Sequence, residues 1–134
     1  APTARNRQQW KVVVVRDAAQ RQVLAEAAEQ AFIADAPVLL AMVGLTLEET
    51  MYCQIPTDPV DCAIVLDHVA LAATAEGLGT CWIGHFDQEK ACKALSVPPA
   101  GRVIELMPLG TPADEPGSKS RKPLDELVCY DRYS

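Results

Sequence analysis

Four segments of the chain have the apolar composition of buried strands. Residues 10–15 contain four consecutive valines, and residues 38–43 are apolar throughout, so both are expected to be buried on both faces of a sheet. The short segment 80–83 and the longer segment 103–109 predict two further strands. The hydrophobic pattern therefore predicts four strands in the interior of the protein.

Three segments with helical composition alternate with these strands. Residues 18–32 follow Asp17, which is placed to cap the start of a helix. Residues 60–76 follow Asp58, a second capping residue, and a proline at the first helical position. A third, shorter helix is expected after Asp87. The alternation of strands and helices by itself favours a parallel, doubly wound sheet.

The helix predicted for residues 60–76 is apolar around almost its whole circumference and ends at Gly77. Such a helix must be covered on most sides, so it is expected to be central to the fold or to lie in a subunit interface. The preceding residues 46–57 show no clear period and predict a loop, of a length that often carries function.

Length and charge limit the possible functions. The 134 residues predict a single domain, residues 1–134, with one core. Apolar residues make up 49% of the chain and charged residues 22%, which is ordinary for a globular protein. The net charge is −6, and the twelve lysines and arginines are scattered except near the C-terminus, so no nucleic-acid partner is expected.

The five cysteines show no regular spacing, and Cys62 and Cys81 fall in apolar segments. This pattern favours reduced thiols and a cytoplasmic protein over a disulfide scaffold. The cysteine and histidine spacings do not match a zinc site, so no metal is expected. The longest uncharged apolar run, residues 36–45, is too short to span a bilayer, and no membrane partner is expected.

The stretch from Gly77 to Phe86 is a candidate ligand site. Gly84 stands where a buried run reaches the surface, and a glycine there lets the backbone approach a flat ligand closely. The alternative is that Gly77 only ends a helix and Gly84 only forms a turn. A dinucleotide-binding loop is rejected, because these glycines follow a helix and precede a strand, the reverse of the order in that motif.

Two polar segments are further candidates. Residues 1–10 form an amide-rich segment that leads into a strand, where a heteroaromatic ring could be recognised; the alternative is a plain turn. Residues 118–122 place three cations and two hydroxyls in one loop. In an acidic protein this loop can hold a phosphate, with a forked contact from Arg121 and a point charge from Lys119; the alternative is a solvated basic loop.

Three segments in this order resemble the FMN-dependent nitroreductase family. Residues 1–10 resemble its A-P-S-x-x-N-x-Q-P-W segment. Residues 61–84, which end in G-L-G-T-C-W-I-G, are similar to its central helix and flavin-facing strand. Residues 108–112, P-L-G-T-P, and residues 119–124, K-S-R-K-P-L, are similar to its closing strand and phosphate-binding tail. The resemblance covers essentially the whole chain.

The resemblance implies an α+β fold of three layers, in which a central mixed, largely antiparallel sheet is flanked by helices. This expectation replaces the parallel sheet favoured by the alternation of elements. It also implies an intertwined homodimer with two FMN sites at the interface. The implied activity passes hydride from NADH or NADPH through the flavin to a nitroaromatic, a quinone or a similar small acceptor.

The resemblance assigns nine residues to the flavin and none to side-chain catalysis. The N-terminal ones would lie along the ring, some of them reaching it from the partner subunit; the central three would present backbone near the flavin N5 atom; the last two would bind the phosphate. These residues are Pro2, Thr3, Ala4 and Asn6, then Ile83, Gly84 and His85, then Lys119 and Arg121.

The chain also departs from the family pattern. Gln9 stands where the family usually has proline, and Thr3 where it usually has serine, which keeps the hydroxyl. The family's Arg-Arg-Ser-x-Arg segment has no counterpart before Ala1, so the N-terminal part of the domain is expected to be missing from this sequence. An alternative function is therefore a flavin-binding or degenerate member that holds FMN without efficient turnover. Flavin fragmentation or dehalogenation on the same scaffold is a third interpretation.

Overall fold

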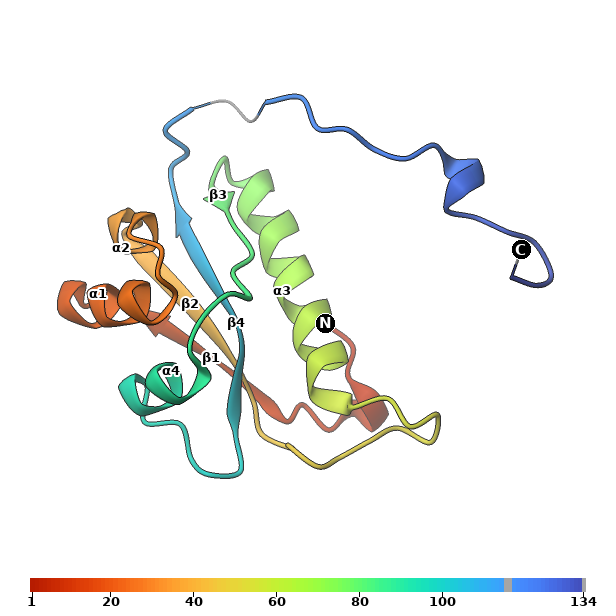
Figure 1. The fold of residues 1–134 in the computed structure, drawn as a ribbon, viewed down its shortest axis with the longest axis horizontal. Helices are drawn as coiled ribbons and strands as arrows, with labels where there is room; N and C mark the ends of the chain where they lie inside the picture. The colour runs from red at the N-terminus through yellow and green to blue at the C-terminus, as the bar shows by residue number, and fades with distance from the viewer. Residues whose placement is uncertain (115–116, 134) are drawn as a thin grey trace.

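The computed structural model describes residues 1–114 and 117–133 (Figure 1). The strands are β1 (Trp10–Val15), β2 (Val38–Gly44), β3 (Gly79–Thr80) and β4 (Arg102–Gly110). The helices are α1 (Ala18–Ala27), α2 (Phe32–Asp35), α3 (Thr57–Ala75) and α4 (Gln88–Ala94), with short 3-10 helices η1 (Ala4–Asn6) and η2 (Leu124–Glu126).

The strands form one sheet in the order β1-β2-β4-β3, and all three strand pairs among the described residues are antiparallel. The parallel sheet favoured by the alternation of elements is therefore wrong, and the largely antiparallel sheet is confirmed. The reason is visible in the register, which pairs Val15 at the end of β1 with Leu39 near the start of β2. The helical connection leaves and re-enters the sheet at the same end, so β2 must run back along β1.

That connection also differs from the single helix predicted for residues 18–32. Helix α1 begins after Asp17, whose carboxylate accepts a hydrogen bond from the Gln20 N–H at 2.8 Å, as expected. It ends at Ala27, however, and Glu29 adopts a left-handed backbone with φ of 55°. The chain therefore turns before α2 and returns to the sheet.

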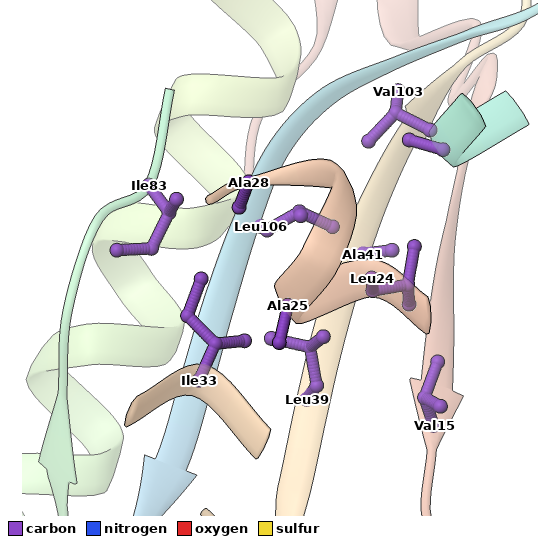
Figure 2. Packing of buried hydrophobic residues seen from close by; sticks show 11 residues of the cluster. Val15, Leu24, Ala25, Ala28, Ile33, Leu39, Ala41, Ile83, Val103 and Leu106 are labelled. Carbon is purple, nitrogen blue, oxygen red and sulfur yellow. The ribbon is translucent and has the colours of Figure 1, made fainter. Parts of the chain in front are cut away.

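Helices cover both faces of the sheet and make three layers (Figure 1). Helix α3 lies on one face, while α1, α2 and α4 lie on the other. The cluster under α1, α2 and α4 is built from Val15, Leu24, Ala25, Ala28, Ile33, Leu39, Ala41, Ile83, Ala91, Val103 and Leu106 (Figure 2). The cluster under α3 is built from Leu40, Met42, Cys62, Val65, Leu66 and Met107. The predicted three-layer α+β fold is confirmed.

Helix α3 ends near Gly77, as predicted, where a φ of 74° suits a residue without a side chain. Its predicted N-cap is wrong, because the helix begins at Thr57 and places Asp58 inside its first turn. The Asp58 carboxylate instead accepts hydrogen bonds from the backbone N–H of Thr46, at 3.0 Å, and from its hydroxyl. Asp58 therefore ties the start of the 46–57 loop to the helix.

The chain beyond β4 leaves the body of the molecule as an extended tail (Figure 1). The described residues from Thr111 onward are exposed. They include large apolar side chains, of which Tyr130 is 84% and Tyr133 is 96% exposed. In the described part of the chain, no helix is both long enough and apolar enough to cross a membrane.

Candidate functional site

The candidate ligand stretch runs along the edge of β4. The strand predicted for residues 80–83 is shorter than expected, because regular pairing in β3 stops at Thr80. Ile83 then forms an isolated bridge to Leu106: its N–H donates to the Leu106 carbonyl at 2.9 Å and its carbonyl accepts from the Leu106 N–H at 3.1 Å. Its side chain points into the cluster with Leu106 (Figure 2). Ile83 is thereby a buried anchor between two exposed residues, Trp82 and Gly84.

Gly84 follows this anchor and presents its backbone at the surface. Within residues 1–114 and 117–133, the N–H groups of Gly84 and His85 have no hydrogen-bond acceptor. The first side-chain atom of a larger residue at position 84 would lie 3.4 Å from a carboxylate oxygen of Glu105. Because Gly84 has no side chain, its backbone stays accessible, and Glu105 lies directly behind that backbone. Two free backbone donors beside a residue with no side chain suit the edge of a flat ring with nitrogen and oxygen acceptors.

A hollow of about 310 Å³ borders this stretch on the side of α1 and α4. Gly84, His85 and Phe86 form one wall, while Glu29 beyond the end of α1 and Lys90 of α4 supply opposite charges. The sequence reasoning did not identify Glu29 or Lys90. Nothing in the local sequence marks them, because only the turn after α1 brings Glu29 beside His85.

A cleft of about 380 Å³ lies on the other side, between α3 and β4. Its apolar walls include Ala63 and Leu66 of α3 together with Trp82. Arg102 and Glu105 are its charged residues. The buried Nε atom of Arg102 has no hydrogen-bond partner in the described part of the chain.

Glu105 is the second functional candidate that the sequence reasoning missed. The registers Met42↔Glu105 and Val43↔Val103 leave Ile104 as an extra residue in β4, which is a β-bulge. Simple alternation would put Glu105 on the same face as Val103, but the bulge puts it with Met107 on the face under α3. A signal was present, since Glu105 interrupts an otherwise apolar run in β4.

Burial raises the pKa of the Glu105 carboxyl above its ordinary value of 4.5. The same face contains Cys62, whose thiol pKa is raised to about 12, first by burial and then by the carboxylates of Asp58 and Asp61, while Arg102 acts in the opposite direction. The α3 face of the sheet is therefore the electrostatically perturbed one, and such perturbed groups gather at functional sites.

The N-terminal candidates lie at the start of α3. The Ala4 N–H donates to both carboxylate oxygens of Asp61, at 3.0 and 3.1 Å, and Asp61 is only 7% exposed. Thr3 accepts the Gln8 N–H on its hydroxyl at 3.2 Å, which closes the segment into a compact turn. Asn6, with a left-handed φ of 55°, accepts the Gln8 side-chain amide at 3.0 Å. Asp61, which the sequence reasoning assigned no role in the site, thus fixes the position of Pro2 to Asn6.

The phosphate candidates lie elsewhere. Lys119 and Arg121 are exposed on the extended tail, away from the body of the molecule (Figure 1). Arg121 donates only to the neighbouring Ser120 carbonyl, at 3.0 Å, within the described residues. One chain alone therefore does not bring Lys119 and Arg121 together with Gly84.

Comparison with known proteins identifies the family of the chain. A sequence profile of the nitroreductase family matches residues 25–111, which is more than half of the chain. The chain belongs to the nitroreductase family. The predicted family and nitroreductase fold are confirmed, and the predicted class of enzyme, an oxidoreductase, is the class of this family.

Individual relatives agree with this membership. A Thermus thermophilus protein named NADH dehydrogenase is 28% identical over an alignment 162 residues long, gaps included. The alignment covers 97% of this chain and 79% of that protein. A nitroreductase family protein from Clostridium novyi NT is 32% identical, with a TM-score of 0.79 over 84% of this chain and 67% of its own. The NADPH:FMN oxidoreductase from Vibrio harveyi, solved in complex with NAD+, is 25% identical, with a TM-score of 0.90 over 100% of this chain and 64% of its own.

Proposed function

We propose that this nitroreductase-family chain is an FMN-dependent oxidoreductase that passes hydride from NADH or NADPH to a nitroaromatic, a quinone or a similar small acceptor. The observation that carries the proposal is the exposed backbone of Gly84, held in place by Ile83 and offering N–H donors without partners in the described chain. The similarity to an NADPH:FMN oxidoreductase supports the choice of FMN and of a nicotinamide reductant.

The residues present fit FMN in three places. Gly84 and His85 can donate backbone hydrogen bonds to the ring edge, and no side chain obstructs Gly84. Pro2 to Asn6, fixed by Asp61, would line the ring. Lys119 and Arg121 would bind the phosphate as a point charge and a fork. Bound FMN would supply the hydride chemistry, while the chain holds the ring and orients it.

The exposed apolar side chains of the chain support a homodimer. The tail carries exposed Leu124, Leu127 and Tyr130 and makes few contacts with its own body, and the outer side of α3 exposes Leu71. Apolar surface of this extent is typical of an interface. We propose that two chains pair along α3 and exchange tails, so that each phosphate-binding pair completes the other subunit's site. Light scattering of the full chain at micromolar concentration should give the mass of a dimer.

The visible absorption spectrum of the purified full chain tests the proposal. A flavin spectrum that NADH or NADPH bleaches is expected, and a colourless protein that ignores added FMN would overturn it. Stable FMN binding without oxidation of either nicotinamide by any acceptor would instead favour the alternative, a member that holds FMN without turnover.

A pair of variants tests the phosphate residues. Replacing both Lys119 and Arg121 by alanine should weaken FMN binding by about 100-fold or more, because two charge-assisted hydrogen bonds are lost and each contributes about 1.5–3 kcal/mol. Lys122→Ala is the matched control, since Lys122 already pairs with Glu126 at 3.8 Å. Equal FMN affinity in the double variant and the control would contradict the assignment.

A further inference from the structure

Glu105 is the acidic residue of β4, and it lies directly behind the proposed flavin contact. One of its carboxylate oxygens is 3.4 Å from the point where a Gly84 side chain would begin, and the other is 3.8 Å away. The β-bulge at Ile104 turns the Glu105 side chain toward α3, into the cleft that Trp82 also lines. Because position 84 is glycine, only backbone separates this carboxyl from a ligand on the exposed side.

The carboxyl is unusual in having no partner. Across residues 1–114 and 117–133, the side-chain carboxylate of Glu105 makes no hydrogen bond and no ion pair, although its backbone belongs to the β2–β4 ladder. Arg102, two residues before the bulge on the same strand, lines the same cleft but is not within ion-pair distance of Glu105. A half-buried carboxyl without a partner carries a desolvation cost, so its position calls for an explanation other than stability.

We propose that Glu105 tunes the reduction of the bound ring through its charge, so that protonation of this carboxyl makes reduction easier. The inference rests on the proposed function, since it requires FMN against Gly84. Reduction by two electrons adds negative charge to the ring, and a carboxylate a few ångströms away opposes this addition. Partial burial limits the screening of that repulsion by water and salt.

The other charged groups near Glu105 do not cancel this effect. On α3, Asp58 and Asp61 lie close to Cys62. Asp58 accepts a hydrogen bond from Thr46, and Asp61 accepts one from Ala4. Strand β2 places the uncharged Met42 opposite Glu105, and α4 contributes the uncharged Gln88 to the cleft. The charged or titratable groups that remain are Arg102 in the cleft and, around Gly84, His85, Glu29 and the pair of Lys90 and Asp87. Among the described residues, none of the cationic ones pairs with Glu105.

A pH dependence follows, with a defined sign. Since burial raises the pKa of Glu105, the carboxyl takes up a proton at a higher pH than an exposed glutamate. As the pH falls, the wild-type protein loses a negative charge beside Gly84, and the potential of the bound flavin should rise more steeply than that of free FMN. A neutral residue at position 105 removes this additional slope.

Equilibrium redox titration of the FMN-loaded full chain against a reference dye, from pH 5 to pH 8, tests the inference. At pH 8, Glu105→Gln should favour the reduced over the oxidised flavin about tenfold relative to wild type, which is about 30 mV for a two-electron couple. The difference should shrink toward pH 5. Glu89→Gln is the matched control, because Glu89 is an exposed acid on α4, and its potential should equal that of wild type at every pH.

The outcomes separate this inference from the proposed function. If the wild-type chain binds no FMN, the proposed function fails before Glu105 is examined. If FMN binds and the wild-type and Glu105→Gln potentials coincide at every pH, the role of Glu105 is overturned. Should Glu105→Gln not fold, Glu105→Met provides a neutral replacement. The wild-type protein also gives a test without any variant: if its flavin potential changes with pH as steeply as that of free FMN and no more, the inference is wrong.

Discussion

The two faces of the sheet are covered by different kinds of side chain. Under α1, α2 and α4, the buried cluster is entirely aliphatic. Under α3, a smaller apolar cluster is joined by the buried carboxylates of Asp58 and Asp61, by Arg102 and by the half-buried Glu105. The first face can be understood from packing alone. The second carries buried charge that packing does not need, and it borders the backbone of Gly84.

This difference separates the face of the sheet that serves stability from the face that also holds the candidate site. Polar groups under α3 hold segments that come from far along the chain: Asp61 holds Ala4, and Asp58 holds Thr46. Gly44 makes room for the second contact, since a side chain there would begin 2.5 Å from an Asp58 oxygen. Apart from Ile83, which anchors the Gly84 stretch, substitutions on the aliphatic face should therefore change stability alone, whereas substitutions under α3 should also change the site.

The largest expected effect is on the aliphatic face. Leu24 of α1 is fully buried, and Leu24→Ala should lower the free energy of unfolding by about 3 kcal/mol through lost burial and the cavity left behind. Urea unfolding measures this change. Val23→Ala is the control, because Val23 is the neighbouring residue and is 44% exposed. The FMN affinity of folded Leu24→Ala should match that of wild type, and a large loss of affinity would break the separation between the faces.

A smaller effect is expected at Asp61. Asp61→Ala leaves the Ala4 N–H without its acceptors and should cost about 1–3 kcal/mol, while Asp61→Asn keeps one acceptor and should cost less. Trypsin should cleave after Arg5 faster in Asp61→Ala, because the N-terminal segment loses its anchor, and FMN affinity should fall as well.

Asp67→Asn is the control for this pair, since Asp67 is an exposed acid on the same helix. Unchanged trypsin cleavage in Asp61→Ala would show that other contacts fix the N-terminal segment, and would remove the distinction drawn for the α3 face.

The sequence predicted the position of every strand but not its direction. Apolar runs are typical of a sheet covered on both faces, and this sheet is covered on both faces although its strands are antiparallel, so the alternation of elements favoured the wrong sheet. For β1 the predicted burial on both faces is also wrong, because this strand lies at the edge of the sheet and Val14 is 52% exposed. Direction depends on the turn at Glu29, where a left-handed backbone breaks the helix without a glycine or proline to mark it. The family resemblance corrected the sheet, because it contains the whole topology.

The candidate site was predictable only in part. Gly84 could be found because a glycine after a buried run has a local meaning. Glu105 could have been noticed, because it interrupts an apolar run, but its face could not be predicted. The bulge at Ile104 decides that face, and a bulge arises from pairing between strands far apart in sequence. Lys119 and Arg121 were found as a basic loop, but their role depends on a second chain and stays a prediction.

The smallest expected effect is a pH dependence on the α3 face. Cys62 keeps its proton in the folded state, with a pKa raised from 9.0 to about 12, while the thiol of the unfolded chain ionises near its ordinary value. Between these values the folded state binds more protons, so stability falls as the pH rises from about 9 toward 12. Between pH 9 and 10 the loss should be about 1 kcal/mol, measured by urea unfolding. Cys62→Ala should lack this component, although lysines and tyrosines still titrate there. Equal slopes for both proteins would show that neither burial nor the neighbouring carboxylates raise the pKa of this thiol.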